Sequence, residues 1–169
     1  MASELYVETL KGLTSGSNAN KVTVGSGQTL YAPGHVLQVV QGTYESTNTT
    51  TSTTAVATGL SASITPSSTS SKILVTVHGS NQLVTSGTTN IYPLYKDGSA
   101  LKSTFMIYSN PTPDGVAMSA SYLDSPSTTS SITYALYFYT ENSGYTASFG
   151  SQTGTGYYLN SITLMEIAG

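Results

Sequence analysis

Strand-length segments, separated by clusters of turn residues, run through this chain from residue 34 to its end. Residues 132–140 show the pattern most clearly, because apolar or aromatic side chains occupy every second position. Alternation with a period of two is typical of β-strands, and no window shows the i, i+3, i+4 apolar spacing of an amphipathic helix. The sequence therefore predicts an all-β fold.

The predicted strands follow one another at short, regular intervals. They cover residues 35–40, 56–64, 72–78, 91–96, 100–108, 115–123, 132–140, 145–149 and 161–167. Residues 43–54 are polar and rich in Thr, and fit either a loop or an extended edge. Asp97-Gly98 is a strong hairpin signal, and Pro93 indicates an edge strand or a bulge. This arrangement favours a single antiparallel β-sandwich, jelly-roll-like, over residues 34–169.

Residues 1–33 differ from the rest, because their apolar patches are only two or three residues long. Such patches cannot bury a core of their own, so we expect an extended N-terminal arm that attaches the protein to a larger particle or pairs with a subunit. A disordered tail is the alternative.

Composition excludes several functions. Charged residues make up 8% of the chain, against about 25% in an average soluble protein. The five Lys are scattered and there is no Arg, which argues against nucleic acid. The chain has no Cys, no apolar run of membrane-spanning length, and no apolar stretch near its start, so we expect no disulfide, no membrane insertion and no secretory signal.

Two strands carry apolar side chains on both faces. In the predicted strands 132–140 and 161–167, apolar or aromatic side chains lie on one face and also on the opposite face. In an antiparallel sandwich, the face of each sheet that is exposed to solvent is normally polar. We therefore predict an oligomer, although the rings could also lie over an exposed sheet face. The predicted interface residues are Tyr134, Tyr137, Phe138, Tyr139, Leu164, Met165 and Ile167.

The sequence offers little for catalysis. The candidate acids Asp97, Asp114, Asp124 and Glu141 each lie in or beside a predicted turn, where Asp and Asn cap the backbone. There is no G-x-S-x-G motif, and two His residues, His35 and His78, cannot complete a zinc site without carboxylates. We expect no enzyme activity, no metal and no cofactor.

Tyrosine is abundant, with 13 residues, and no Trp is present. Aromatic rings stack on sugar rings, so one interpretation is a platform for a glycan or a partner. The other interpretation is that these rings pack inside the sandwich or between subunits. The candidate contact residues are Tyr92, Tyr95, Tyr108, Tyr145, Tyr157 and Tyr158.

Five stretches of the sequence carry a resemblance to a known group of proteins: residues 5–14, 18–22, 66–75, 123–130 and 161–168. Together they resemble small virion proteins of tailed phages that infect marine bacteria and cyanobacteria. The joint order of these motifs along the chain carries the resemblance.

The resemblance implies a non-enzymatic β-sandwich knob on the virion, assembled as a homotrimer. Its role would be that of a short tail fibre or a capsid decoration (cement) protein, and its partners would be capsid, portal or tail proteins. A host surface glycan is a further expected partner if the protein lies at a fibre tip. A free-standing carbohydrate-binding module is the alternative function.

Overall fold

The computed structural model describes residues 32–82, 89–108, 115–150, 152–153, 156–157 and 159–169. The chain divides into two units, Met1–Ala32 and Pro33–Gly169, and the fold below is that of the second. The predicted arm over residues 1–33 lies outside the described residues, except for its last two.

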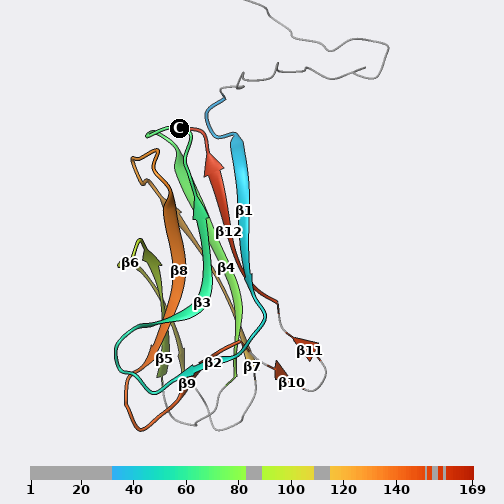
Figure 1. The fold of residues 1–169 in the computed structure, drawn as a ribbon, viewed down its shortest axis with the longest axis vertical. Helices are drawn as coiled ribbons and strands as arrows, with labels where there is room; N and C mark the ends of the chain where they lie inside the picture. The colour runs from blue at the N-terminus through green and yellow to red at the C-terminus, as the bar shows by residue number, and fades with distance from the viewer. Residues whose placement is uncertain (1–31, 83–88, 109–114, 151, 154–155, 158) are drawn as a thin grey trace, which may run out of the picture. The chain divides into compact units, whose positions relative to one another are not determined.

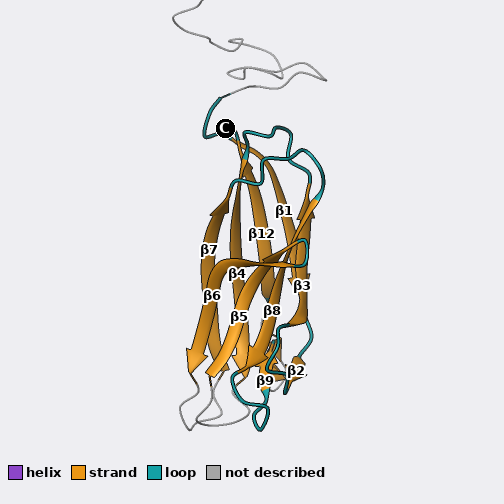
Figure 2. Cartoon of the chain, turned by 90° about the vertical axis from the view of Figure 1, so that its left-hand side faces the viewer, coloured by secondary structure: helices purple, strands orange, loops and turns teal. Residues whose placement is uncertain are grey.

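The first sheet, here called sheet 1, has four antiparallel strands in the order β1-β12-β4-β7. Figure 1 shows β1, β12 and β4 running side by side, and Figure 2 shows β7 beside β4. Their bounds are β1 Val36–Tyr44, β12 Asn160–Ile167, β4 Lys72–Gln82 and β7 Gly115–Asp124.

The second sheet, sheet 2, has four antiparallel strands in the order β3-β8-β5-β6. It forms the other layer of the molecule, as Figure 2 shows. Its strands are β3 Val56–Ile64, β8 Ile132–Thr140, β5 Thr89–Lys96 and β6 Ser99–Tyr108.

The strand order defines the fold. Consecutive main strands lie in opposite sheets, except for the β5–β6 hairpin within sheet 2, and the last strand, β12, lies beside the first, β1. Two interleaved four-stranded sheets of this order form a jelly roll, which confirms the predicted β-sandwich. Two short pairs complete the described strands, β2 Asn48–Thr50 with β9 Ala147–Phe149 and β10 Gln152–Thr153 with β11 Gly156–Tyr157. No described residue lies in a helix, so none of them belongs to a helix that could span a membrane.

The core lies between the two sheets, where every second side chain points inward. In β8, the residues at even positions from Ile132 to Phe138 are almost fully buried, and those at odd positions are not. The largest fully buried side chains come from both sheets and from β9, and include Leu60, Ile73, Tyr92, Leu94, Tyr134, Leu136, Phe138, Phe149, Ile162 and Leu164.

The predicted hairpin joins β5 to β6. Asp97 and Gly98 have φ angles of 47° and 77°, so both central residues adopt the left-handed conformation of a type I′ turn. The Asp97 backbone N–H donates to the Thr133 carbonyl, and the Asp97 Oδ1 accepts from the Thr133 N–H at 2.8 Å. The turn is thereby fixed to the start of β8.

Pro93 lies in a central strand, because β5 pairs with β8 on one side and with β6 on the other. Of the two predicted explanations, the edge strand is therefore wrong and the irregularity is right. The β5–β6 register shifts between Pro93 and Tyr95, which places extra residues of β6 opposite this point. An interruption of this kind accommodates a residue that has no N–H to donate.

Candidate functional site

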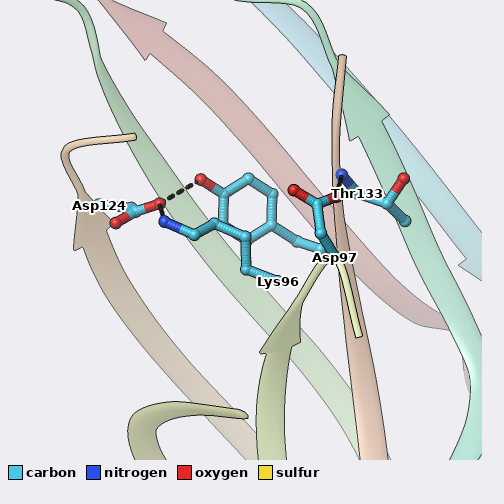
Figure 3. A network of polar contacts seen from close by, with 5 residues as sticks. Lys96, Asp97, Asp124 and Thr133 are labelled. Carbon is cyan, nitrogen blue, oxygen red and sulfur yellow. Dashed lines mark hydrogen bonds and ion pairs between the residues drawn. The ribbon is translucent and has the colours of Figure 1, made fainter. Parts of the chain in front are cut away.

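An ion pair between Lys96 and Asp124 links the two sheets of the sandwich. The Lys96 amine lies 2.8 Å from Asp124 Oδ2, and the Tyr134 hydroxyl donates to the same oxygen at 2.6 Å. Figure 3 shows the Lys96 amine reaching Asp124 while Asp97 points to Thr133. This network joins the end of β7 in sheet 1 to β5 and β8 in sheet 2.

Hydrogen bonding decides the ionisation of this network. Burial opposes the charge on Asp124, but its bonds from Lys96 and Tyr134 outweigh burial and hold the pKa of that carboxyl below its usual range. Burial, together with the neighbouring Asp124, raises the pKa of the Tyr134 phenol. A carboxylate held in its charged form cannot act as a general acid near neutral pH.

A second buried carboxylate, Glu166, closes one end of the sandwich. Its Oε1 accepts from the Ser67 backbone N–H at 2.7 Å and from the Ser67 hydroxyl at 2.6 Å. Its Oε2 accepts from Gln38 Nε2 at 2.6 Å. Burial opposes ionisation, but these bonds prevail and lower the pKa of Glu166. The residue therefore fixes the 66–71 loop to β1 and β12.

The other candidates for chemistry do not converge. His35, His78 and Glu141 are exposed, and Asp114 lies outside the described residues. Among the residues that the structure describes, no three His, Cys, Asp or Glu side chains gather around a point where a metal ion could bind. A cavity of about 360 Å³ lies beside β4 and β7, and His78 is the single titratable side chain in its lining.

The predicted contact tyrosines are scattered. Tyr92 is wrong as a surface contact, because it is fully buried and its hydroxyl donates to the Ser148 carbonyl at 2.6 Å. Tyr95 and Tyr145 are half-buried. Tyr158 lies outside the described residues, as do the side chains of Tyr108 and Tyr157, whose backbones belong to β6 and β11.

The predicted interface residues divide by face. Tyr134, Phe138 and Leu164 are wrong as interface residues, because each has no exposed surface and packs in the core of its own subunit. Tyr137 and Tyr139, on β8, and Met165 and Ile167, on β12, lie on the opposite faces of their strands and are half-buried. Only the outer faces of the two sheets can therefore offer these strands to a partner.

The outer face of sheet 1 carries a continuous row of apolar side chains. In the strand register, Val39 lies opposite Met165, Met165 opposite Leu74, and Leu74 opposite Leu123. These four residues, here called the apolar row, cross all four strands of sheet 1. With strands about 4.8 Å apart, the row is about 14 Å long.

The row is open at both ends. Val39 is 57% exposed and Leu123 is 49% exposed, while Met165 and Leu74 between them are half-buried. Val36, which is 43% exposed, and Ile167 extend the apolar surface along β1 and β12. By contrast, the next outward positions along the four strands are Gln41, Thr163, Thr76 and Ser121.

The outer face of sheet 2 is different in character. Tyr95 of β5 and Tyr137 of β8 stack with ring centroids 3.9 Å apart and ring planes 19° apart. Both rings are half-buried, and each shields part of the other. Sequence reasoning named both residues but assigned them to different roles, because it could not bring their rings together.

Sequence reasoning missed three members of the row, Val39, Leu74 and Leu123. Each is an apolar residue at an outward position of its strand, and that alternation is visible in the sequence. Their alignment depends on the register of four strands that are far apart in the chain. Strands β1 and β12 are separated by more than 100 residues, so a local sequence pattern could not predict this alignment.

No protein-family model matches this chain, and a search of curated proteins finds no significant match.

Proposed function

We propose that this protein is a non-enzymatic structural protein of a phage particle, a surface-exposed β-sandwich that assembles with copies of itself. The expected assembly is a trimer that acts as a short tail fibre, a knob or a capsid decoration. The observation that carries the proposal is the apolar row on the outer face of sheet 1. The phage assignment itself derives from the sequence resemblance.

An uncovered apolar row favours association. Monomeric soluble proteins rarely expose contiguous apolar patches larger than about a few hundred Å², and exposed apolar patches above that size mark interaction sites. Within one subunit the two ends of the row, Val39 and Leu123, remain about half exposed to water. Each such side chain gains up to about 2 kcal/mol when it is fully removed from water. A copy of the chain that covers this face would recover that free energy.

The low charge of the chain suits a buried face. On the outer side of sheet 1, the described strands carry one Lys, Lys72, and no acid, so covering this face leaves few charges without water. Jelly rolls are common in viral capsid and lectin domains, which is compatible with both a decoration and a receptor-binding tip. The fold alone does not select a function.

A structural role also accords with three of the five acids that the structure describes. Asp97 fixes a hairpin, Asp124 is bonded to Lys96 and Tyr134, and Glu166 is bonded to Ser67. Each of these groups already has a partner that the fold needs. A glycosidase would require a carboxylate pair facing an open cleft.

A carbohydrate-binding module remains the second candidate, and one observation favours it. The Tyr95–Tyr137 stack places two half-exposed rings on the outer face of sheet 2. Beside it, Ser63 and Thr133 share a hydroxyl hydrogen bond of 2.8 Å. Rings and hydroxyls together are the groups that bind neutral sugars.

The test is sedimentation velocity of the full chain and two charge variants. Leu74→Glu places an acid in the centre of the apolar row, and Ala135→Glu places one at a half-buried outward position in the centre of sheet 2. We expect the wild type to assemble, Leu74→Glu to stay folded but sediment as a smaller species than the wild type, and Ala135→Glu to assemble as the wild type does.

Other outcomes would decide against the proposal. A wild type that stays monomeric at all concentrations contradicts self-assembly, and disruption by Ala135→Glu alone moves the interface to sheet 2. Glycan binding by a monomer that is lost in Tyr137→Ala would select the carbohydrate-binding module. Mass spectrometry of purified particles tests the virion assignment separately.

A further inference from the structure

The two main sheets have four edge strands, and three of them are interrupted. The β1 ladder shifts between Val36 and Gln38, the β3 ladder between Ala57 and Ser61, and the β6 ladder opposite Pro93 and Tyr95. In each case the extra residues belong to the edge strand itself. Irregularities of this kind twist an edge and prevent it from pairing with another chain.

The fourth edge strand, β7, has no such protection. Its ten residues pair with β4 in consecutive register, without a shift from Gly115 to Asp124. The segment Gly115–Leu123 contains no charged residue and no proline. The one charge, on Asp124 at the very end, is bonded to Lys96. In the described part of the chain, no strand pairs with the free side of β7.

An edge with these properties is a template for strand addition. It presents a row of backbone N–H and C=O groups that are not used by β4. Natural proteins usually blunt such edges with Lys, Pro or a bulge. Because the other three edges of this molecule follow that rule, the regular and uncharged β7 points to an edge that has a partner.

We propose that β7 pairs antiparallel with β7 of a second copy of this chain, which joins two copies of sheet 1 into one continuous sheet. A two-fold axis at Ala120 keeps inward residues opposite inward residues. The predicted cross-strand pairs are then Ser119 with Ser121, Met118 with Tyr122, and Ala117 with Leu123 of the second copy.

The side chains favour this register. Ser119 and Ser121 are small, exposed and on the outer face, so they meet without a clash. Met118 and Tyr122 point inward, where a thioether beside an aromatic ring is a favourable contact. The two Asp124 carboxylates lie at opposite ends of the pair, each opposite Val116, so like charges do not meet across the axis.

This inference rests on the proposed self-assembly but adds a separate contact. The apolar row is a face, whereas β7 is an edge, and either can be removed without the other. Pairing about a two-fold axis gives an assembly with an even number of chains. Trimers that also pair through β7 would therefore form hexamers or larger even-numbered assemblies.

The experiment is a charge swap across the predicted axis, measured by sedimentation of the full chain. Ser119→Glu/Ser121→Glu places Glu opposite Glu twice in each pair. Ser119→Lys/Ser121→Glu places Lys opposite Glu instead. The control is Gln41→Glu/Thr43→Glu, which makes the same change on β1, at positions of the same two rows of sheet 1.

We expect Ser119→Glu/Ser121→Glu to weaken pairing about tenfold, from two like-charge contacts that each lie within the usual cross-strand range. Ser119→Lys/Ser121→Glu should restore it at least to the wild-type level, and the β1 control should leave it unchanged. An assembly with an odd number of chains, or one that all three variants leave intact, would overturn the β7 contact while leaving the proposed self-assembly in place. A monomeric wild type would instead refute self-assembly itself, and the β7 contact with it.

Discussion

Gly42 lies where β1 of sheet 1 passes close to β3 of sheet 2. A Cβ atom at this position would lie 2.0 Å from the Ser61 carbonyl oxygen of β3 and 3.3 Å from Ile162 Cγ2. Ordinary van der Waals contact begins near 3.4 Å, so Gly42→Ala requires the β1 and β3 backbones to separate by about 1.4 Å. The clash is with backbone on an inward face, and no side-chain rotation can relieve it.

The cost follows from this geometry. Inserting a methyl group into a packed core usually costs about 1–3 kcal/mol, and a clash with backbone belongs at the upper end. We expect Gly42→Ala to lose about 3 kcal/mol of unfolding free energy, and to melt about 6–12 °C lower. Chemical denaturation followed by tyrosine fluorescence or circular dichroism measures this directly.

A matched variant separates the clash from the general effect of adding a methyl group. Gly144→Ala meets only Asn142 Oδ1 at 3.5 Å, so we expect it to be neutral or slightly stabilising. If Gly42→Ala unfolds within about 0.5 kcal/mol of the wild type, then β1 does not pack on β3 as described. The jelly-roll closure on that side would then be wrong.

Three further predictions concern the polar contacts. The folded-state pKa of Glu166 is lowered, so the ionised carboxylate adds to the free energy of unfolding at any pH above its unfolded pKa of about 4.3. This stabilisation is lost as pH falls through the lowered folded-state pKa. Glu166→Gln should therefore lower the free energy of unfolding at pH 7 and make it fall less steeply in acid, which denaturation at a series of pH values measures. Tyr134→Phe should cost about 1.5–3 kcal/mol, because it removes a charge-assisted bond, and should raise the pKa of Asp124 in an NMR titration. Asp97→Ala should cost about 2 kcal/mol in thermal unfolding, since Ala disfavours φ near 47° and cannot accept from Thr133, whereas Asp97→Asn should be close to neutral.

The two outer faces separate the candidate functions. Sheet 1 offers an aliphatic row and a regular edge, which suit contacts between protein chains. Sheet 2 offers a pair of stacked tyrosines beside hydroxyl groups, which suits a sugar. A fibre tip could use both faces, with one for assembly and the other for a host glycan. The charge variants above test these faces one at a time.

The sequence alone determined the fold class, because strand and turn preferences are local. Residues 56–64 and 132–140 are strands with the predicted bounds, and the Asp97-Gly98 hairpin follows from the left-handed φ angles that these residues tolerate. The alternation within residues 132–140 also divided the strand into two faces. These features depend on neighbours within a few positions.

Only the tertiary structure decided which apolar faces are available to a partner. Sequence alternation could not reveal that Tyr92, Tyr134 and Phe138 face the core of their own subunit, since inside and outside are defined by the opposite sheet. Nor could it align Val39 with Leu123, because that row depends on the register of four strands joined by long connections. Register and layer order are set by contacts between distant segments, which leave no local trace in the sequence.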